Sequence, residues 1–203
     1  MEKGCTMKRL AQAIGLSGTI CFAIAIVSGC ATRTVYLEGR RAFPAKPRFT
    51  IMPREYTQEE LRVAGIRTDG VYVRVGHRPE ELRVAQEQTF REKGWRTGSP
   101  FLRFWPNGRV MGRLPSVDFL TVGDVDSFEK AGIGYFEITT NGVVEIERYL
   151  YHSGIWDHTY RRSRFYVEGD TIWRDLGSMH NGEPIQLGYR FVPIKGMRSQ
   201  PDW

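Results

Sequence analysis

The stretch IGYFEITTNGVVEIERYLYHSGIWDHTYRRSRFYVEGDTIWRDL, residues 133–176, decides the fold of this chain. It holds four runs rich in Val, Ile, Tyr, Phe and Trp, in which apolar and polar residues alternate as in half-buried strands. Asn141-Gly142 separates the first two runs and Gly169-Asp170 the last two, and both dipeptides favour tight hairpin turns. The stretch therefore predicts consecutive antiparallel strands.

The same pattern continues on both sides of this stretch, and Pro106-Asn107-Gly108 supplies a third hairpin turn. The eight candidate strands are Gly70 to Val75, Phe101 to Trp105, Arg109 to Arg113, Ile133 to Thr139, Val143 to Tyr151, His158 to Glu168, Thr171 to Leu176 and Gln186 to Pro193. Pro79 to Lys93 and Asp124 to Lys130 lack the alternation and predict one or two short helices.

Because strands joined by hairpins are neighbours, eight of them can close on themselves. The fold class predicted is mainly β: an eight-stranded antiparallel up-and-down barrel, with a split β-sandwich as the alternative. In strand number and order this arrangement resembles small lipocalin-like domains.

Alternation also predicts which residues face the interior of the barrel. The inward set is Val71, Val73, Val75, Leu102, Phe104, Phe136, Ile138, Val144, Ile146, Leu150, Phe165, Val167, Leu187, Tyr189 and Phe191. Arg148 and Arg174 share this parity and are the candidate ligand-binding residues. A buried guanidinium needs an anionic partner, and a carboxylate or phosphate of an amphiphilic ligand would meet it bidentately. Alternatively, both arginines lie at the barrel mouth or pair with internal carboxylates.

The N-terminus has the features of an exported precursor. Lys3, Lys8 and Arg9 precede an uncharged stretch from Leu10 to Val27, as in a secretory signal peptide. Val27-Ser28-Gly29-Cys30 follows at once and resembles the lipobox of bacterial lipoproteins. That resemblance implies cleavage before Cys30 and acylation of this cysteine, which would anchor the chain to membrane lipid. Ala31, where an Asp would favour the inner membrane, implies the periplasmic side of the outer membrane in a two-membrane cell.

Three segments are expected on this basis: a lipoprotein signal peptide over 1–29, a lipidated N-terminus and flexible tether over 30–56, and one β-barrel domain over 57–203. Pro44, Pro47 and Pro53 lie among basic residues in the tether, where neither a helical nor a strand period is sustained. Cys5 and Cys21 fall in the segment to be removed, so Cys30 is the last thiol and no internal disulfide is expected.

Composition and motifs exclude several function classes. The net charge is +6, of which +2 lies in the signal segment, and basic residues are mixed with acids along the body, so nucleic-acid binding is not expected. The chain has no Gly-x-Ser-x-Gly turn, Cys–His pair or Gly-rich phosphate loop, so neither an enzyme nor a cofactor is predicted. His152 and His158 flank one turn, but nothing completes a metal site with them.

Tyr160, Arg162, Arg164 and Tyr166 share one strand face and form the candidate interaction surface. Three functions therefore stay open: a noncatalytic interaction or structural module with a partner in the cell envelope, a lipocalin-like carrier of a small amphiphilic ligand, and an enzyme of unrecognised type. The first of these is the prediction.

Overall fold

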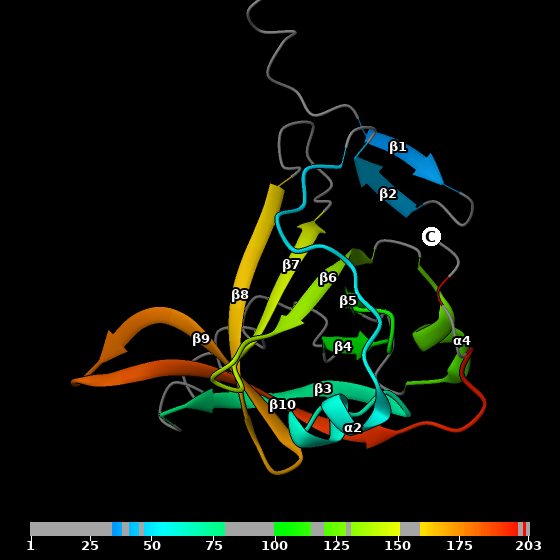
Figure 1. Ribbon diagram of the computed structural model, residues 1–203. Coiled ribbons are helices and arrows are strands. Elements are labelled where there is room, and N and C mark those ends of the chain that lie inside the picture. Colours follow the sequence, from blue (N-terminus) through cyan, green and yellow to red (C-terminus); the bar gives the residue numbers. More distant parts are fainter. Residues whose placement is uncertain are drawn as a thin grey trace, which may run out of the picture. The chain divides into compact units, whose positions relative to one another are not determined.

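The computed structural model describes residues 34–37, 41–44, 47–79, 100–114, 120–128, 131–150, 159–198 and 201. Eight antiparallel strands form a closed barrel in the order β10-β3-β4-β5-β6-β7-β8-β9 (Figure 1). Their bounds are β3 Gly70–Arg78, β4 Phe101–Phe104, β5 Arg109–Arg113, β6 Gly132–Ile138, β7 Val144–Leu150, β8 Thr159–Glu168, β9 Thr171–His180 and β10 Glu183–Pro193. The predicted barrel is confirmed, and the structure is not the split sandwich.

The predicted hairpin turns account for the order of the strands. Gly108 and Gly142 adopt φ values of 73° and 72°, in the left-handed region that glycine enters without steric cost. Each closes a hairpin between consecutive strands, β4 with β5 and β6 with β7. Strands β9 and β10 are longer than predicted, because they continue as a hairpin as far as His180 and Glu183.

Two short helices accompany the barrel, and both begin with a capping box. Helix α2 spans Gln58–Val63, where Thr57 and Glu60 exchange side-chain and backbone hydrogen bonds, and it was not predicted. Helix α4 spans Val122–Asp126 and begins two residues before the turn expected at Asp124. Residues 80–93 of the other predicted helix lie outside the described residues.

The segment predicted as a tether contains regular structure and buried residues. Strands β1 (Thr34–Leu37) and β2 (Arg41–Pro44) pair as an antiparallel hairpin. Further on, Ile51 and Tyr56 are buried. The Glu147 carboxylate on β7 accepts hydrogen bonds from the backbone N–H groups of Thr50 and Ile51, at 2.6 and 2.8 Å. Within the predicted tether, this carboxylate thus holds the backbone of Thr50 and Ile51 against the barrel.

The apolar residues form two clusters, one on each side of the barrel wall. The inner cluster includes Phe104, Phe136 and Phe165, as predicted. The outer cluster combines Val71 and Val73 with Val125 of α4 and with Ile194 and Met197 after β10. The inward assignment of Val71 and Val73 is therefore wrong, and Tyr72 faces the interior instead. Alternation misleads here because this part of the wall is buried on both faces.

In the part of the chain that the structure describes, no helix has the length and apolarity needed to cross a membrane.

Candidate functional site

The interior of the barrel is packed at the end beside the β6–β7 and β8–β9 turns. Tyr56, just before α2, stacks on Phe136 with ring centroids 5.0 Å apart, and Phe104 meets the same ring edge-on at 5.1 Å. The Tyr56 hydroxyl donates to the carbonyl of Phe136 and accepts from the N–H of Ile138. Leu61 of α2 belongs to the same cluster. Aromatic side chains thus fill this half of the interior.

The opposite half carries arginine side chains on its inner face. On β7, Arg148 follows Val144 and Ile146 at alternate positions. Its direct partner on β8 is Arg161, which has the same parity as the inward Phe165. Arg174 lies on β9 opposite Phe165. The structure thus places the predicted Arg148 and Arg174 on the inner face and adds Arg161 to them.

The Arg148 guanidinium occupies space that glycines leave free on the inner wall. Arg148 pairs with Gly134 on β6, and its side chain continues toward Gly112 on β5. A Cβ atom built on Gly112 would lie 1.5 Å from Nη1 of Arg148 and 3.0 Å from Cδ2 of Leu102. Only glycine at position 112 therefore accepts the guanidinium where it is.

The three arginines influence one another electrostatically. Burial lowers the pKa of Arg148 to about 10, and the positive charges of Arg174 and Arg161 also lower it, whereas Tyr189 raises it. The pKa of Arg174 is lowered mainly by burial and then by Arg161, and Tyr189 again acts in the opposite direction. Both guanidinium groups nevertheless stay protonated at pH 7, so this half of the interior is positively charged.

The charge of these arginines is not balanced within the described part of the chain. None of its ion pairs involves Arg148, Arg161 or Arg174. The Nε atom of Arg174 is buried and has no hydrogen-bond partner among these residues. A buried polar group without a partner costs stability, so the cluster is better suited to an anionic ligand than to an empty interior.

The arginine cluster opens to the surface where β8 and β9 separate. The two strands pair only from Phe165 with Arg174 to Glu168 with Thr171. Beyond this point β8 stays on β7 while β9 continues with β10, and Figure 1 shows the two strands diverging. A pocket of about 400 Å³ lies there, lined by Glu145, Arg161, Arg162, Ser163, Arg164, Arg174, Asp175, Leu176 and Gly177. Arg161, Ser163, Arg174 and Leu176 belong to the inner face.

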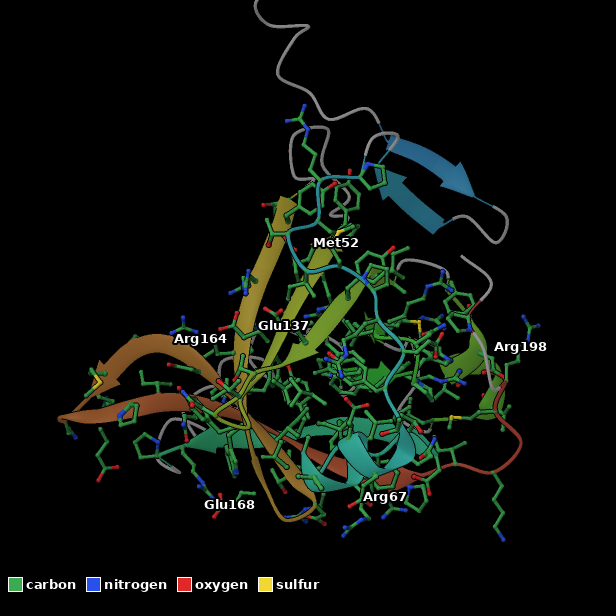
Figure 2. All side chains as sticks on the ribbon, in the orientation of Figure 1. Met52, Arg67, Glu137, Arg164, Glu168 and Arg198 are labelled. Atoms are coloured by element: carbon green, nitrogen blue, oxygen red, sulfur yellow. The ribbon has the colours of Figure 1, made fainter. Side chains whose placement is uncertain are left out.

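The candidate interaction surface lies on the outer face of β8, and its charges are paired. Arg162 contacts Glu137 at 2.6 Å and also Glu145, while Arg164 contacts Glu145 at 3.0 Å. Figure 2 shows Arg164 beside β8, on the side toward which β9 bends. These ion pairs hold the pKa of Glu145 below its usual value although burial acts against them.

The two tyrosines of this surface differ in their surroundings. The Tyr160 hydroxyl accepts from the N–H of Arg48 at 3.0 Å, and its ring meets that of Phe49 edge-on at 5.0 Å. Tyr166 is exposed. Contacts within the domain thus engage Tyr160, Arg162 and Arg164. These contacts account for the three residues on this face without a second protein bound to it.

Sequence reasoning missed Arg161 and Ser163 as inward residues, although the signal was present. Both share parity with Phe165, and the same parity that places Arg162 and Arg164 on the outer face separates Arg161 from them. Strand parity separates the members of a run of basic residues, and it places Arg161 inside and Arg162 outside.

The histidines give no separate site in the described part of the chain. His152 and His158 lie outside it, and within it no group of three or more His, Cys, Asp or Glu side chains could hold a metal ion. His77 pairs with Leu187 of β10, and burial, followed by the charge of Arg74, lowers its pKa.

No family model, curated protein or solved structure matches this chain. The arginine cluster combines three features: positive charge that no carboxylate of the described residues pairs with, a pocket that reaches the surface, and a glycine that leaves room for one guanidinium.

Proposed function

We propose that the protein is an envelope lipoprotein whose barrel binds a small anionic ligand at Arg148, Arg161 and Arg174. The observation that carries this proposal is that Arg161 and Arg174 line a pocket of about 400 Å³ without an ion pair to a described carboxylate, while Arg148 adds a third positive charge on the inner face. This volume lies at the small end of the range of ligand pockets, about 300–1,000 Å³. Among the predicted functions, the geometry favours the carrier over the interaction module.

Two features support a binding role rather than a structural one. Bringing three like charges into one half of a barrel destabilises the free protein, and an apolar interior would avoid that cost. In addition, planar guanidinium groups match the oxygen geometry of carboxylates and phosphates, so a bound anion would satisfy the unpartnered donors. We propose no chemical step, and the ligand would leave the site unchanged.

Arg174→Gln tests the proposal directly. Calorimetric titration of the full chain in phosphatidylcholine nanodiscs with hexyl phosphate, hexyl sulfate and hexanoate should show binding of at least one of these anions. The variant should bind that anion at least about 10-fold more weakly, since a hydrogen bond to a charged group contributes about 1.5–3 kcal/mol. Arg190→Gln is the matched control, because Arg190 is exposed on β10 and its replacement removes the same charge. Wild-type protein that binds none of the three anions would refute the proposal.

Gly112→Ala tests whether the site is shaped in advance for the guanidinium. The new methyl group would overlap Nη1 of Arg148 and displace this flexible side chain, so we expect affinity to fall about 10-fold with little loss of stability. Gly123→Ala adds the same methyl group on α4, where Thr121 Oγ1 at 3.6 Å is the nearest atom, and should leave affinity unchanged. Equal affinities of the Gly112→Ala variant and the wild type would show that the Arg148 position does not matter.

Membrane anchoring is proposed from Cys30 and the preceding lipobox. Cys30→Ala should abolish incorporation of radiolabelled palmitate and leave the uncleaved precursor, because the variant has no thiol at the modification position. The label is read by autoradiography of cell fractions, with Cys21→Ala as the control that keeps the lipobox intact. A Cys30→Ala chain that is still labelled and cleaved would contradict lipidation at this residue.

A further inference from the structure

The charges around the pocket indicate which kind of anion it would bind. Of the two carboxylates that line it, Glu145 pairs with Arg162 and Arg164, and Asp175 accepts the N–H of Gly177 at 2.8 Å, a bond that leaves its negative charge in place. Arg161 and Arg174 line the pocket without an ion pair to any described carboxylate, and the four arginines and two carboxylates of the lining sum to +2. A single negative charge would neutralise only half of this excess.

The geometry points to a ligand with a compact head that carries at least two negative charges, namely a phosphate monoester, on a short body. This inference rests on the proposed function and narrows it. A phosphate monoester presents three acceptor oxygens and, with a second pKa of about 6, is mostly a dianion at pH 7.5. Guanidinium groups of several residues can then bond to different oxygens of one head. A carboxylate has only two such oxygens, so it can bond to fewer guanidinium groups.

Donors from two adjacent strands line the pocket. Arg161 of β8 and Arg174 of β9 are among its lining residues, while Arg148 on β7 pairs with Arg161 and extends its guanidinium toward Gly112. Ser163, two residues after Arg161 on the inner face of β8, also lines the pocket. A tetrahedral head accepts donors from several directions, whereas a planar carboxylate accepts them mainly in its own plane.

The filled half of the barrel limits the body of the ligand. The centroid of the Phe136 ring lies 5.0 Å from that of Tyr56 and 5.1 Å from that of Phe104, which is close packing for aromatic groups. Phe165, on the same strand as Arg161 and directly opposite Arg174, joins this cluster. A long acyl chain would have to displace these rings, so it is not expected to enter the barrel behind the head. Leu176 at the pocket supplies apolar surface for a short body.

A comparison of isosteric ligands tests the charge of the head. Hexyl phosphate and hexyl sulfate have nearly the same shape, but the phosphate is a dianion and the sulfate a monoanion at pH 7.5. Calorimetry on the full chain in phosphatidylcholine nanodiscs should show at least about 10-fold tighter binding of the phosphate, which corresponds to 1.4 kcal/mol. Arg161→Gln should reduce this preference, and Arg190→Gln should leave it unchanged. Arg161 lies on the inner face where the pocket opens and is exposed to solvent there, so its replacement is not expected to prevent folding.

A series from butyl to octyl phosphate tests the length of the body. A chain buried along the whole lumen would gain about 4-fold in affinity per added methylene, at about 0.8 kcal/mol each. We expect instead a plateau of affinity from hexyl to octyl phosphate.

Vesicles of phosphatidylcholine with phosphatidic acid distinguish two sources of the same head group. If they compete with hexyl phosphate, a membrane lipid supplies the head; if they do not, a soluble ester does.

The outcomes separate this inference from the proposed function. Equal affinity for hexyl phosphate, hexyl sulfate and hexanoate would overturn the dianionic head but leave a general anion site. A continued 4-fold gain per methylene would overturn the short body. Absence of binding for all three anions would overturn the proposed function itself, and the inference with it.

Discussion

Replacing Asp126 with Ala should lower the free energy of unfolding by about 3–4 kcal/mol, because it leaves the buried charge of Arg103 without its counterion. Arg103 is 1% exposed on the outer face of β4, and its guanidinium contacts the Asp126 carboxylate at the end of α4. The same guanidinium donates to the carbonyls of Val125, at 2.9 Å, and Arg198, and stacks over Trp105. Figure 2 shows Arg198 beside α4. The arginine thus joins α4 and the C-terminal segment to the barrel wall.

Urea unfolding of the wild type and the variant at pH 7 measures this change. The double variant Arg103→Met with Asp126→Leu is the control, since it removes both charges and keeps apolar volume in their place. We expect it to be more stable than Asp126→Ala, as is usual when a buried ion pair is exchanged as a whole. A loss below about 1 kcal/mol for Asp126→Ala would mean that the backbone carbonyls alone satisfy Arg103.

Arg148→Met should have two opposite effects, a loss of anion binding and a gain of stability. Removing a buried, hydrogen-bonded charge from a binding site weakens affinity by about 30-fold or more. In the free protein the same charge is disfavoured, because burial lowers the pKa of Arg148 to about 10. Methionine fills similar volume without a charge, so the unfolding free energy at pH 7 should rise by about 1–2 kcal/mol. This gain is smaller than the full pKa shift would give, because solvent reaches part of the site and screens the charge.

The pH dependence of this gain has a definite sign. The folded-state pKa of Arg148, about 10, lies below the value in the unfolded chain, so the wild type bears the penalty at every pH below 10. Above pH 10 the folded protein releases the proton and the penalty shrinks, so wild type and variant should converge. Denaturation at pH 7 and pH 10.5, together with hexyl phosphate titration at pH 7.5, measures both effects. A variant that is less stable at pH 7 would assign Arg148 a structural role.

The barrel was predictable because local signals specify it. Asn-Gly and Gly-Asp turns at 141–142 and 169–170 separate alternating runs, and hairpin topology follows from them. Helix α2 could also have been predicted, since Thr57 and Glu60 have the spacing of a capping box. The burial of Val71 could not, because it depends on α4 and the C-terminal segment, which are distant in sequence.

The site was predictable only in part, for a similar reason. Parity along single strands places Arg148 and Arg174 inside. That Arg174 lines a pocket with Arg161 depends on the separation of β8 from β9, and the position of the Arg148 guanidinium depends on the space above Gly112; no local pattern encodes either. Likewise, the pairing of Arg162 and Arg164 with Glu145 requires the register of β7 and β8.

The hydrogen bonds from Thr50 and Ile51 to Glu147 have a mechanical consequence. Together with the bond from the N–H of Arg48 to the Tyr160 hydroxyl, they fasten the N-terminal approach of the domain to β7 and β8, so tension applied through the proposed membrane anchor would load these two strands. Arg148 is the next residue on β7 and points to the opposite face. Such a pull would therefore act on the wall that carries Arg148 and Arg161, two of the proposed ligand-binding residues.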